Sequence, residues 1–326
     1  MLLRLLGVVV SCLVGLVIAE IGLRLVSGES DQPRSTAVPD RHRVGMGRAD
    51  HRNRSWRKDK EAGKFRIVVV GDSFAWGAGV HPEDAYPDRL EERLNTIDRK
   101  RRFEVVNFSR PGWNTIQAYR VARQPLRRLE PDLLILTYVL NDAEPTDRNE
   151  RMSRRRVKLR REPSPGASAW LHGHSLLYRT IWERLENTRQ RRAFTAVFFQ
   201  HYTGETWKEC RKGLELFQGL ADRLGIPLVM VVFPVFDSQI DEGYPYHELH
   251  ETVATAAGEL GIRVFDLRET YRGVDARRLA VTPFTDAHPN ELAHRLAADA
   301  VLEYLVETDL APIERRRKRT RQKKNS

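Results

Sequence analysis

Cysteine is nearly absent from this sequence of 326 residues, which contains only Cys12 and Cys210. Because these two cysteines lie far apart, and one falls in an apolar N-terminal run, a disulfide-stabilised scaffold is excluded. A structural zinc site built from cysteine and histidine lacks ligands for the same reason. His172 and His174 have no acidic neighbours at ligand spacing, so we expect no metal site around them.

Acidic residues are missing from two stretches that hold much of the positive charge. Residues 315–326 contain eight Lys and Arg, and residues 151–161 contain seven more, with no acid in either run. The formal net charge is +11, so the rest of the chain is slightly acidic. Basicity confined to two solvated strips argues against a specific nucleic-acid partner. It fits segments that touch anionic phospholipid headgroups or another polyanion.

Charge of either sign is absent from residues 5–19, and the apolar character continues to Val26 apart from Glu20 and Arg24. An apolar run of about 20 residues is long enough to span a bilayer as a helix. Glu20 and Arg24 are four residues apart, so they can pair on one helical face. We expect residues 1–26 to form a transmembrane anchor that attaches the protein to a membrane.

Two other interpretations of this segment stay open: a cleaved signal peptide, and a buried core helix. No small-residue cleavage site follows the apolar run, which speaks against cleavage. A lipoprotein signal at Cys12 is excluded because the apolar stretch continues beyond it. Orientation is open as well, because Arg4 alone precedes the segment and several arginines follow it, which does not favour an exported C-terminus.

The chain beyond the apolar segment divides into a tether at residues 27–63, a domain at residues 64–310 and a basic tail at residues 311–326. Within the domain, short β-branched or apolar runs alternate with helical patterns. The predicted strands are residues 65–70, 103–108, 132–140, 227–233 and 262–265. This alternation indicates an α/β domain with a mostly parallel sheet.

An insertion at residues 143–203 interrupts that alternation directly after the third predicted strand. Ligands bind at the carboxyl ends of strands in open α/β sheets, which is where this segment leaves the sheet. We expect it to act as a lid or side wall that selects the substrate and lies close to the membrane. The alternative is an inert elaboration of the surface.

Ser73 follows the first predicted strand, in the sequence Gly71-Asp72-Ser73-Phe74. A serine at this place is displayed at the carboxyl edge of the sheet, where its hydroxyl can act as a nucleophile. A serine before a helix is also a common N-cap. From this tetrapeptide alone both roles are open.

His288 lies near the other end of the domain, two residues after Asp286 and two before Asn290. A serine nucleophile needs a base, and a histidine oriented by a carboxylate is the usual one. The alternative is that Asp286 and Asn290 only cap the following helix, which leaves His288 exposed.

Two further candidate residues, Gly112 and Asn141, follow predicted strands. Gly112 comes after the second strand and can bring its backbone N–H close to a ligand. Asn141 comes after the third and places a carboxamide at the same edge. With the Ser73 N–H, these groups would supply three donors to the oxyanion of an acyl-transfer reaction.

Taken in order, Ser73, Gly112, Asn141 and His288 resemble the four motif positions of the SGNH/GDSL hydrolase family. The resemblance covers roughly residues 64–310. It implies a flavodoxin-like three-layer α/β/α fold and ester hydrolysis without a metal or cofactor.

The sequence departs from the family pattern at two places. Val139 stands where the family usually has glycine before the Asn-Asp pair. Asp286 precedes His288 by two residues, whereas the family usually has three. The shorter spacing resembles that of envelope polysaccharide O-acetyltransferases and O-acetylesterases.

The sequence therefore predicts a membrane-anchored serine esterase on the extracytoplasmic, periplasmic side, acting on an ester of a lipid or a cell-envelope glycan. One alternative is an O-acyltransferase that uses the same residues to pass the acyl group to a sugar hydroxyl. Another is a catalytically silent envelope-binding module. The sequence leaves the oligomeric state open.

Overall fold

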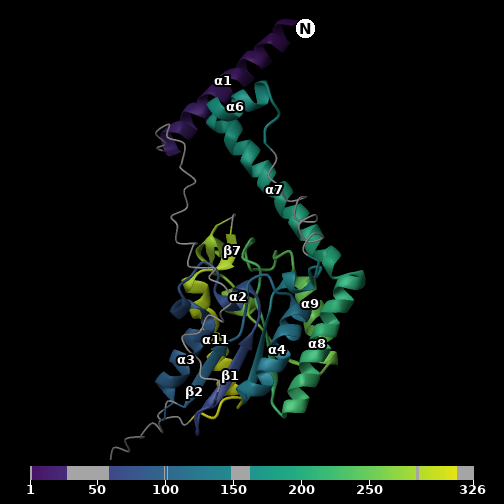
Figure 1. Ribbon diagram of the computed structural model, residues 1–326. Coiled ribbons are helices and arrows are strands. Elements are labelled where there is room, and N and C mark those ends of the chain that lie inside the picture. Colours follow the sequence, from purple (N-terminus) through teal and green to yellow (C-terminus); the bar gives the residue numbers. More distant parts are fainter. Residues whose placement is uncertain are drawn as a thin grey trace, which may run out of the picture. The chain divides into compact units, whose positions relative to one another are not determined.

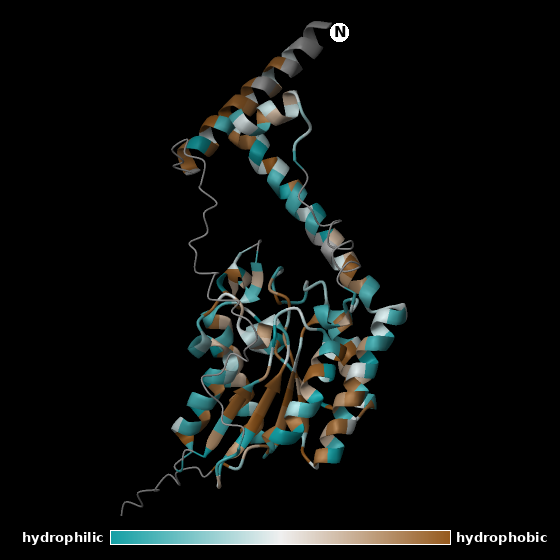
Figure 2. Cartoon of the chain, viewed as in Figure 1, coloured by the Kyte–Doolittle hydropathy of each residue, from teal (hydrophilic) through white to brown (hydrophobic). Residues whose placement is uncertain are grey.

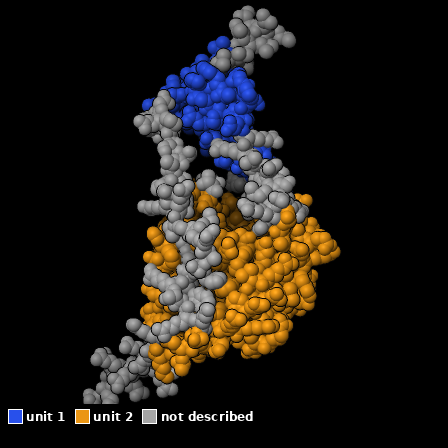
Figure 3. All heavy atoms as spheres, viewed as in Figure 1, with its two compact units in different colours: residues 1–39, 152–197 blue, residues 40–151, 198–326 orange. Residues whose placement is uncertain are grey.

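The computed structural model describes residues 2–27, 59–98, 100, 102–147, 162–283 and 286–313. Most of the predicted tether, the basic run at residues 151–161 and nearly all of the basic tail lie outside these described residues. The chain divides into two compact units, shown in Figure 3. Unit 1 contains residues 1–39 and 152–197, and unit 2 contains residues 40–151 and 198–326.

Unit 2 is built around a five-stranded sheet in the order β2-β1-β3-β4-β5, in which every neighbouring pair is parallel. The strands are β1 (Phe65–Val70), β2 (Phe103–Asn107), β3 (Leu133–Tyr138), β4 (Leu228–Val232) and β5 (Arg263–Asp266). Every residue of β3 and β4 is buried. Short runs that are apolar at consecutive positions form such strands because both faces of the sheet are covered. Figure 2 shows this apolar character along the strands.

Helices cover both faces of the sheet (Figure 1). α3 (Tyr86–Ile97) and α11 (Glu291–Glu307) pack together on one side, while α4 (Thr115–Leu129), α8 (Gly204–Leu224) and α9 (His247–Glu259) lie on the other. Alternate winding on the two faces, with the strand order 2-1-3-4-5, is the flavodoxin-like arrangement. The predicted α/β class with a mostly parallel sheet is confirmed. In this strand order, successive strands are added on one side of β1 and then on the other. Ligands bind at the carboxyl ends of the strands where this change occurs.

The first long helix after β1, α3, follows a short turn. A 3₁₀ turn, η2 (Pro82–Asp84), comes first, and α3 begins at Tyr86 with Pro87 in its first turn. Proline has no N–H to donate and is tolerated at the start of a helix, so Pro87 favours a helix that begins here.

The remaining elements of unit 2 are short. They are α2 (Ser73–Trp76), η3 (Leu140–Ala143), α10 (Arg268–Tyr271) and η4 (Ala276–Arg278), together with the antiparallel pair β6 (Ala280–Thr282) and β7 (Asp286–Pro289). α2 and η3 follow β1 and β3 directly, so both lie at the carboxyl edge of the sheet.

Unit 1 contains α1 (Leu2–Ser27), α6 (Ala167–His174) and most of α7 (Leu176–His201). The Glu20 carboxylate of α1 accepts hydrogen bonds from the N–H groups of Leu176 and Leu177, both at 2.8 Å, and from the Ser175 hydroxyl at 2.9 Å. Arg24 pairs with the same carboxylate at 2.8 Å. Glu20 therefore supplies the N-terminal cap of α7 from a distant helix, because the first N–H groups of a helix have no partner within it.

Over the residues that the structure describes, no helix has the length and the apolar character needed to cross a membrane. The description leaves out residue 1 and the side chains of residues 2–6, 8, 9, 13 and 27. The anchor expected at residues 1–26 therefore stays a prediction.

Candidate active site

Ser73 lies where β1 ends against β3. A Cβ added to Gly71 would come within 2.8 Å of the Thr137 Cβ and 2.9 Å of the Ala75 Cβ. Only glycine fits this close approach, and the chain can then turn directly into α2. Ser73 is the first residue of α2 and is 7% exposed.

The N-cap of α2 is Asp72, not Ser73. One Asp72 carboxylate oxygen accepts the Phe74 N–H at 2.8 Å, which satisfies a backbone donor at the start of the helix. The capping role considered for Ser73 is thus filled by its neighbour. The Ser73 hydroxyl makes its shortest hydrogen bond to the His288 ring.

Asp286 and His288 lie on β7, two residues apart. Side chains two apart on a strand point to the same face, so this spacing brings the two groups together. The Asp286 Oδ1 lies 2.5 Å from the His288 Nδ1 and also accepts the His288 backbone N–H at 3.1 Å. Asn290 caps α11 by accepting the Leu292 and Ala293 N–H groups, so Asp286 is not needed for that role.

The other imidazole nitrogen of His288, Nε2, lies 2.9 Å from the Ser73 Oγ. A carboxylate only accepts hydrogen bonds, so the Nδ1 proton points to Asp286 and Nε2 is left to accept from the serine hydroxyl. The His288 side chain is 33% exposed, so a substrate can reach it. The Phe74 ring lies against the imidazole, with centroids 5.3 Å apart.

Asn141 lies on η3, on the other side of Asp72. Its Nδ2 donates to the Asp72 Oδ2 at 3.0 Å, and the same oxygen lies 3.3 Å from the Ser73 Oγ. A carboxamide nitrogen carries two protons, so one remains after the bond to Asp72. The Asp72 carboxyl group therefore lies between the serine and the asparagine, although these two residues are far apart in the sequence.

Two buried carboxyl groups accompany the site. Burial raises the pKa of Asp72, which is 1% exposed, although the Phe74 N–H and the Asn141 amide act in the opposite direction. Burial also raises the pKa of Asp142 well above its ordinary value, and the nearby charge of Asp72 adds to the effect. The ionised forms of both groups are costly in this environment.

Gly112 lies in the turn after β2, with φ +81°, a conformation that favours glycine. A Cβ added there would meet nothing within 4 Å. The turn is attached to the loop between β1 and α2 because the Arg110 N–H donates to the Gly71 carbonyl at 3.1 Å. Gly112 follows Arg110 by two residues in this turn, and its role as an oxyanion donor stays a prediction.

Val139 occupies the position where the related motif has glycine, and its backbone is extended, with φ −132° and ψ 156°. Any residue adopts this conformation, so no glycine is required there. The Val139 N–H donates to the Asp142 Oδ2 at 2.8 Å. The substitution leaves the Asn141 turn intact.

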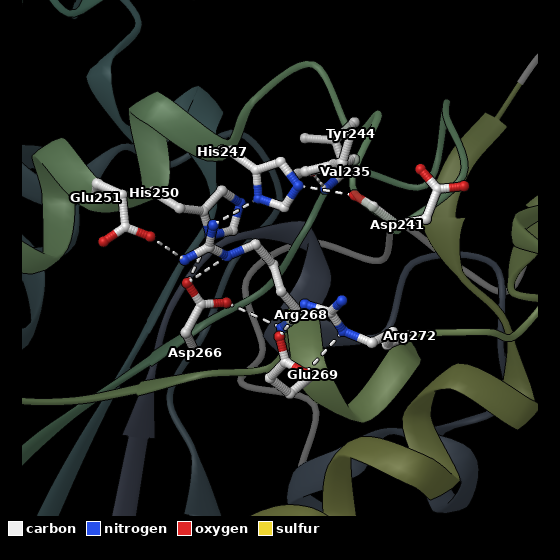
Figure 4. Close-up of polar contacts among 10 residues, drawn as sticks. All are labelled: Val235, Asp241, Tyr244, His247, His250, Glu251, Asp266, Arg268, Glu269 and Arg272. Atoms are coloured by element: carbon white, nitrogen blue, oxygen red, sulfur yellow. Dashed lines mark hydrogen bonds and ion pairs between the residues drawn. The ribbon is translucent and has the colours of Figure 1, made fainter.

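Sequence reasoning missed the connection that Asp72 makes to Asn141, because it joins residues 69 positions apart. It also missed a second His–carboxylate pair at the end of β5, shown in Figure 4. There the His250 Nδ1 lies 2.9 Å from the Asp266 Oδ2, and Arg268 pairs with Asp266 at 2.9 Å.

This second pair has a structural role. The His250 side chain is fully buried, and Arg268 also pairs with Glu251 of α9 at 2.6 Å. Burial alone would raise the pKa of Asp266, but His250 and Arg268 together lower it. The network fixes α9 to the end of β5. In the part of the chain that the structure describes, no three His, Cys, Asp or Glu side chains gather where they could hold a metal ion.

Solved structures that the chain resembles include the following three. An acetylxylan esterase from Geobacillus stearothermophilus, crystallised as a catalytic mutant, has 14% identity and a TM-score of 0.48, and the match covers 79% of this chain and 100% of that one. TesA has 16% identity and a TM-score of 0.45, with 74% of this chain and 97% of that one covered. The acetyl xylan esterase AlAXEase has 15% identity and a TM-score of 0.45, with 74% and 100% covered. No curated protein matches the sequence.

A serine hydroxyl hydrogen-bonded to a histidine at the carboxyl edge of a parallel sheet is the arrangement of α/β serine hydrolases. The model of the GDSL-like Lipase/Acylhydrolase family matches residues 69–296, which is well over half of the chain. The chain belongs to this family and is an ester hydrolase.

Proposed function

We propose that Ser73 is the nucleophile of a serine esterase, with His288 as its general base and Asp286 as the group that orients the base. The supporting observation is the continuous chain of hydrogen bonds from the Ser73 Oγ through His288 to Asp286, at 2.9 and 2.5 Å. In the first step the Ser73 Oγ bonds to the ester carbonyl carbon. Its proton passes to the His288 Nε2, and the resulting imidazolium is stabilised by the Asp286 carboxylate.

The carbonyl oxygen becomes an oxyanion in this step. The second Nδ2 proton of Asn141, the Ser73 N–H and the Gly112 N–H are the donors that we assign to it. Asp72 holds the first Nδ2 proton of Asn141, which leaves the second for the reaction. When the tetrahedral intermediate collapses, the C–O bond to the alcohol breaks and the imidazolium proton goes to the leaving oxygen.

Hydrolysis of the acyl-enzyme repeats these steps with water. His288 takes a proton from water, the hydroxide oxygen bonds to the acyl carbon, and the proton then returns to the Ser73 Oγ as the carboxylic acid leaves. No metal or cofactor takes part in these steps. The substrate class that we propose is an ester of a lipid or a cell-envelope glycan, in keeping with an apolar N-terminal helix and basic segments suited to anionic surfaces.

The test compares wild type with Ser73→Ala, His288→Ala and the double variant, using p-nitrophenyl esters of acetate and of longer acids. Each single variant should lose ~10⁴-fold or more in kcat, and the double variant little beyond that, because the residues act as one unit. Ser109→Ala, at a buried serine after β2, is the matched control and should stay within a few-fold of wild type. A Ser73→Ala variant that kept most of the wild-type rate would exclude the mechanism.

Two further outcomes distinguish the alternative functions. Acyl product that appears on an added glycan, with the same residues required, would assign a transferase. Failure of Ser73 to react with a fluorophosphonate probe in the folded protein would assign a silent binding module. The proposal expects Ser73 to be labelled and water to be the acceptor.

We also propose that α1 anchors the enzyme in a membrane, with unit 2 on the extracytoplasmic side. Residues 5–19 are uncharged, and described apolar side chains of α1, such as Leu16 and Ile18, are more than half exposed and need a cover. A reporter that is active only outside the cytoplasm, fused after residue 326, should be active. Activity of a cytoplasm-only reporter at the same position would reverse the orientation, and release of the protein by alkaline carbonate would exclude the anchor.

A further inference from the structure

The insertion returns to unit 2 beside the turn that carries Asn141. After α7 ends at His201, the next residue, Tyr202, is 7% exposed, and α8 begins at Gly204. The Tyr202 hydroxyl donates to the Leu140 carbonyl at 3.2 Å. Leu140 is the first residue of η3 and precedes Asn141 directly.

The direction of the hydrogen bonds around Tyr202 is fixed by that carbonyl. Because a carbonyl only accepts, the Tyr202 proton points to Leu140, and the Tyr202 oxygen accepts from the Tyr138 hydroxyl, 2.8 Å away. The Tyr138 oxygen is in turn left to accept from the Cys210 thiol, at 3.4 Å. These groups are all buried, so a group that loses its hydrogen-bond partner cannot bond to water instead.

The turn that holds Asn141 is therefore fixed on two sides. On one side Tyr202 holds the Leu140 carbonyl. On the other side the Asp142 carboxylate accepts the Val139 N–H at 2.8 Å and the Thr115 hydroxyl at 2.9 Å. Both contacts act on the backbone that aims the Asn141 side chain, and neither contacts the reacting atoms.

We propose that Tyr202 is a positioning residue for the oxyanion donor Asn141. This inference rests on the proposed function, and it deepens that function by naming the group that sets the aim of Asn141. Loss of the Tyr202 hydroxyl frees the Leu140 carbonyl and lets η3 shift, so the second Nδ2 proton of Asn141 no longer points at the developing oxyanion. A donor placed for the transition state acts on kcat and leaves ground-state binding nearly unchanged.

Tyr202 belongs to the segment that closes the insertion, so its contact also gives the insertion a physical connection to catalysis. The Trp207 ring lies against the Tyr202 ring, with centroids 4.9 Å apart, and fixes the tyrosine on the α8 side. The connection runs through unit 2 alone, because residues 138–147 and 198–210 both belong to it.

The experiment measures kcat and KM of Tyr202→Phe, Asn141→Ala and the double variant with a p-nitrophenyl ester. Removing one oxyanion donor costs ~10²–10³-fold in kcat, so a misplaced one should cost about tenfold. We expect Tyr202→Phe to lose about tenfold in kcat with KM within about twofold of wild type. The double variant should match Asn141→Ala, because a donor that is absent cannot be misplaced.

Tyr271→Phe is the matched control, since the Tyr271 hydroxyl also donates to a buried backbone carbonyl, that of Ala293, at 2.9 Å. Tyr271→Phe should lose about as much stability as Tyr202→Phe, but it should keep the kcat of wild type. Tyr138→Phe, which removes the donor to Tyr202, should give a smaller loss of kcat and serves if Tyr202→Phe fails to fold. Equal kcat for Tyr202→Phe and Tyr271→Phe, or independent effects in the double variant, would overturn the inference. A Ser73→Ala variant with normal activity would instead overturn the proposed function.

Discussion

Asp142 shows how a single buried residue can support the site at the expense of stability. Both of its oxygens accept hydrogen bonds, one from the Val139 N–H and one from the Thr115 hydroxyl. Burial and the nearby charge of Asp72 raise its pKa well above the ordinary value. A carboxyl group whose pKa is raised by folding stabilises the folded state only while it is protonated.

Asp142→Asn should therefore gain stability relative to wild type as the pH rises. The amide oxygen can accept the Val139 N–H, and the amide nitrogen can donate to the Thr115 hydroxyl, so both contacts survive without a buried charge. Below the ordinary aspartate pKa of about 3.9 the two proteins should differ little. Above it, the free energy of unfolding of wild type should fall relative to the variant, by up to about 1.4 kcal/mol per pH unit until the raised pKa is passed.

Urea denaturation of both proteins near pH ~4 and pH ~7.5 measures this difference. Asp222→Asn, at an exposed aspartate of α8, is the control and should follow the wild-type curve at both pH values. A stability difference between Asp142→Asn and wild type that stays constant with pH would contradict the prediction.

At the scale of elements, β7 determines how His288, the proposed base, lies relative to the Asp286 carboxylate. The strand places Asp286 and His288 on one face because side chains alternate along it. This is why a spacing of two residues works here although the related motif usually has three. A spacing of three residues would need a different backbone between the two groups, so the number of residues and the conformation have to be considered together.

Inserting one alanine after Ala287 should disrupt this pairing, even though it restores the more usual spacing. A shift of one residue moves a side chain to the opposite face of a strand, so Asp286 would point away from the His288 ring. We expect a loss in kcat similar to that of Asp286→Asn, ~10²-fold or more.

The control is an alanine inserted after Gly273, in the turn that follows α10, which should leave kcat within a few-fold of wild type. Kinetics with a p-nitrophenyl ester, together with thermal unfolding to show that each variant is folded, provide the measurement. Normal activity after insertion at Ala287 would mean that β7 is not rigid enough to impose its alternation.

At the scale of the whole molecule, every residue assigned to the chemistry lies in unit 2. Replacing residues 150–197 with a Gly/Ser linker of about ten residues should therefore leave Ser73 reactive toward a fluorophosphonate. The replacement retains Phe198, which packs edge-on against Tyr246 at 5.3 Å, and the Tyr202 contacts. Unit 2 should unfold within a few degrees of its temperature in wild type.

The same variant tests the lid expected from the sequence. A changed preference between short and long acyl esters, or a changed response to anionic vesicles, would support a lid or side wall. An unchanged profile in a folded protein would leave the insertion as a surface elaboration. Loss of fluorophosphonate labelling would contradict the assignment of the reaction to unit 2.

The sequence predicts the fold well because the sheet depends on local patterns. β1 lies at Phe65–Val70, as its apolar pattern indicates. The placement of Ser73 and Asn141 at one edge also follows, since both come directly after parallel strands.

Local patterns in the sequence do not predict the long-range contacts of the site. The bond between Asp72 and Asn141 joins residues 69 positions apart, and that between Tyr202 and Leu140 spans 62. No local pattern records either bond, because each depends on where separate loops meet in the folded chain. The sequence likewise leaves open whether Ser73 caps α2, and in the structure Asp72 fills that position.

The placement of the histidine and its carboxylate on one strand has a consequence for how the enzyme could be divided. The segment from β6 to α11, residues 280–307, contributes both groups, while Ser73 and Asn141 come from the first half of unit 2. A fragment that ends before Ala280 retains Ser73 but has neither His288 nor Asp286. Activity should then return only when the missing C-terminal segment is supplied and α11 docks on α3, so the enzyme is suited to fragment complementation.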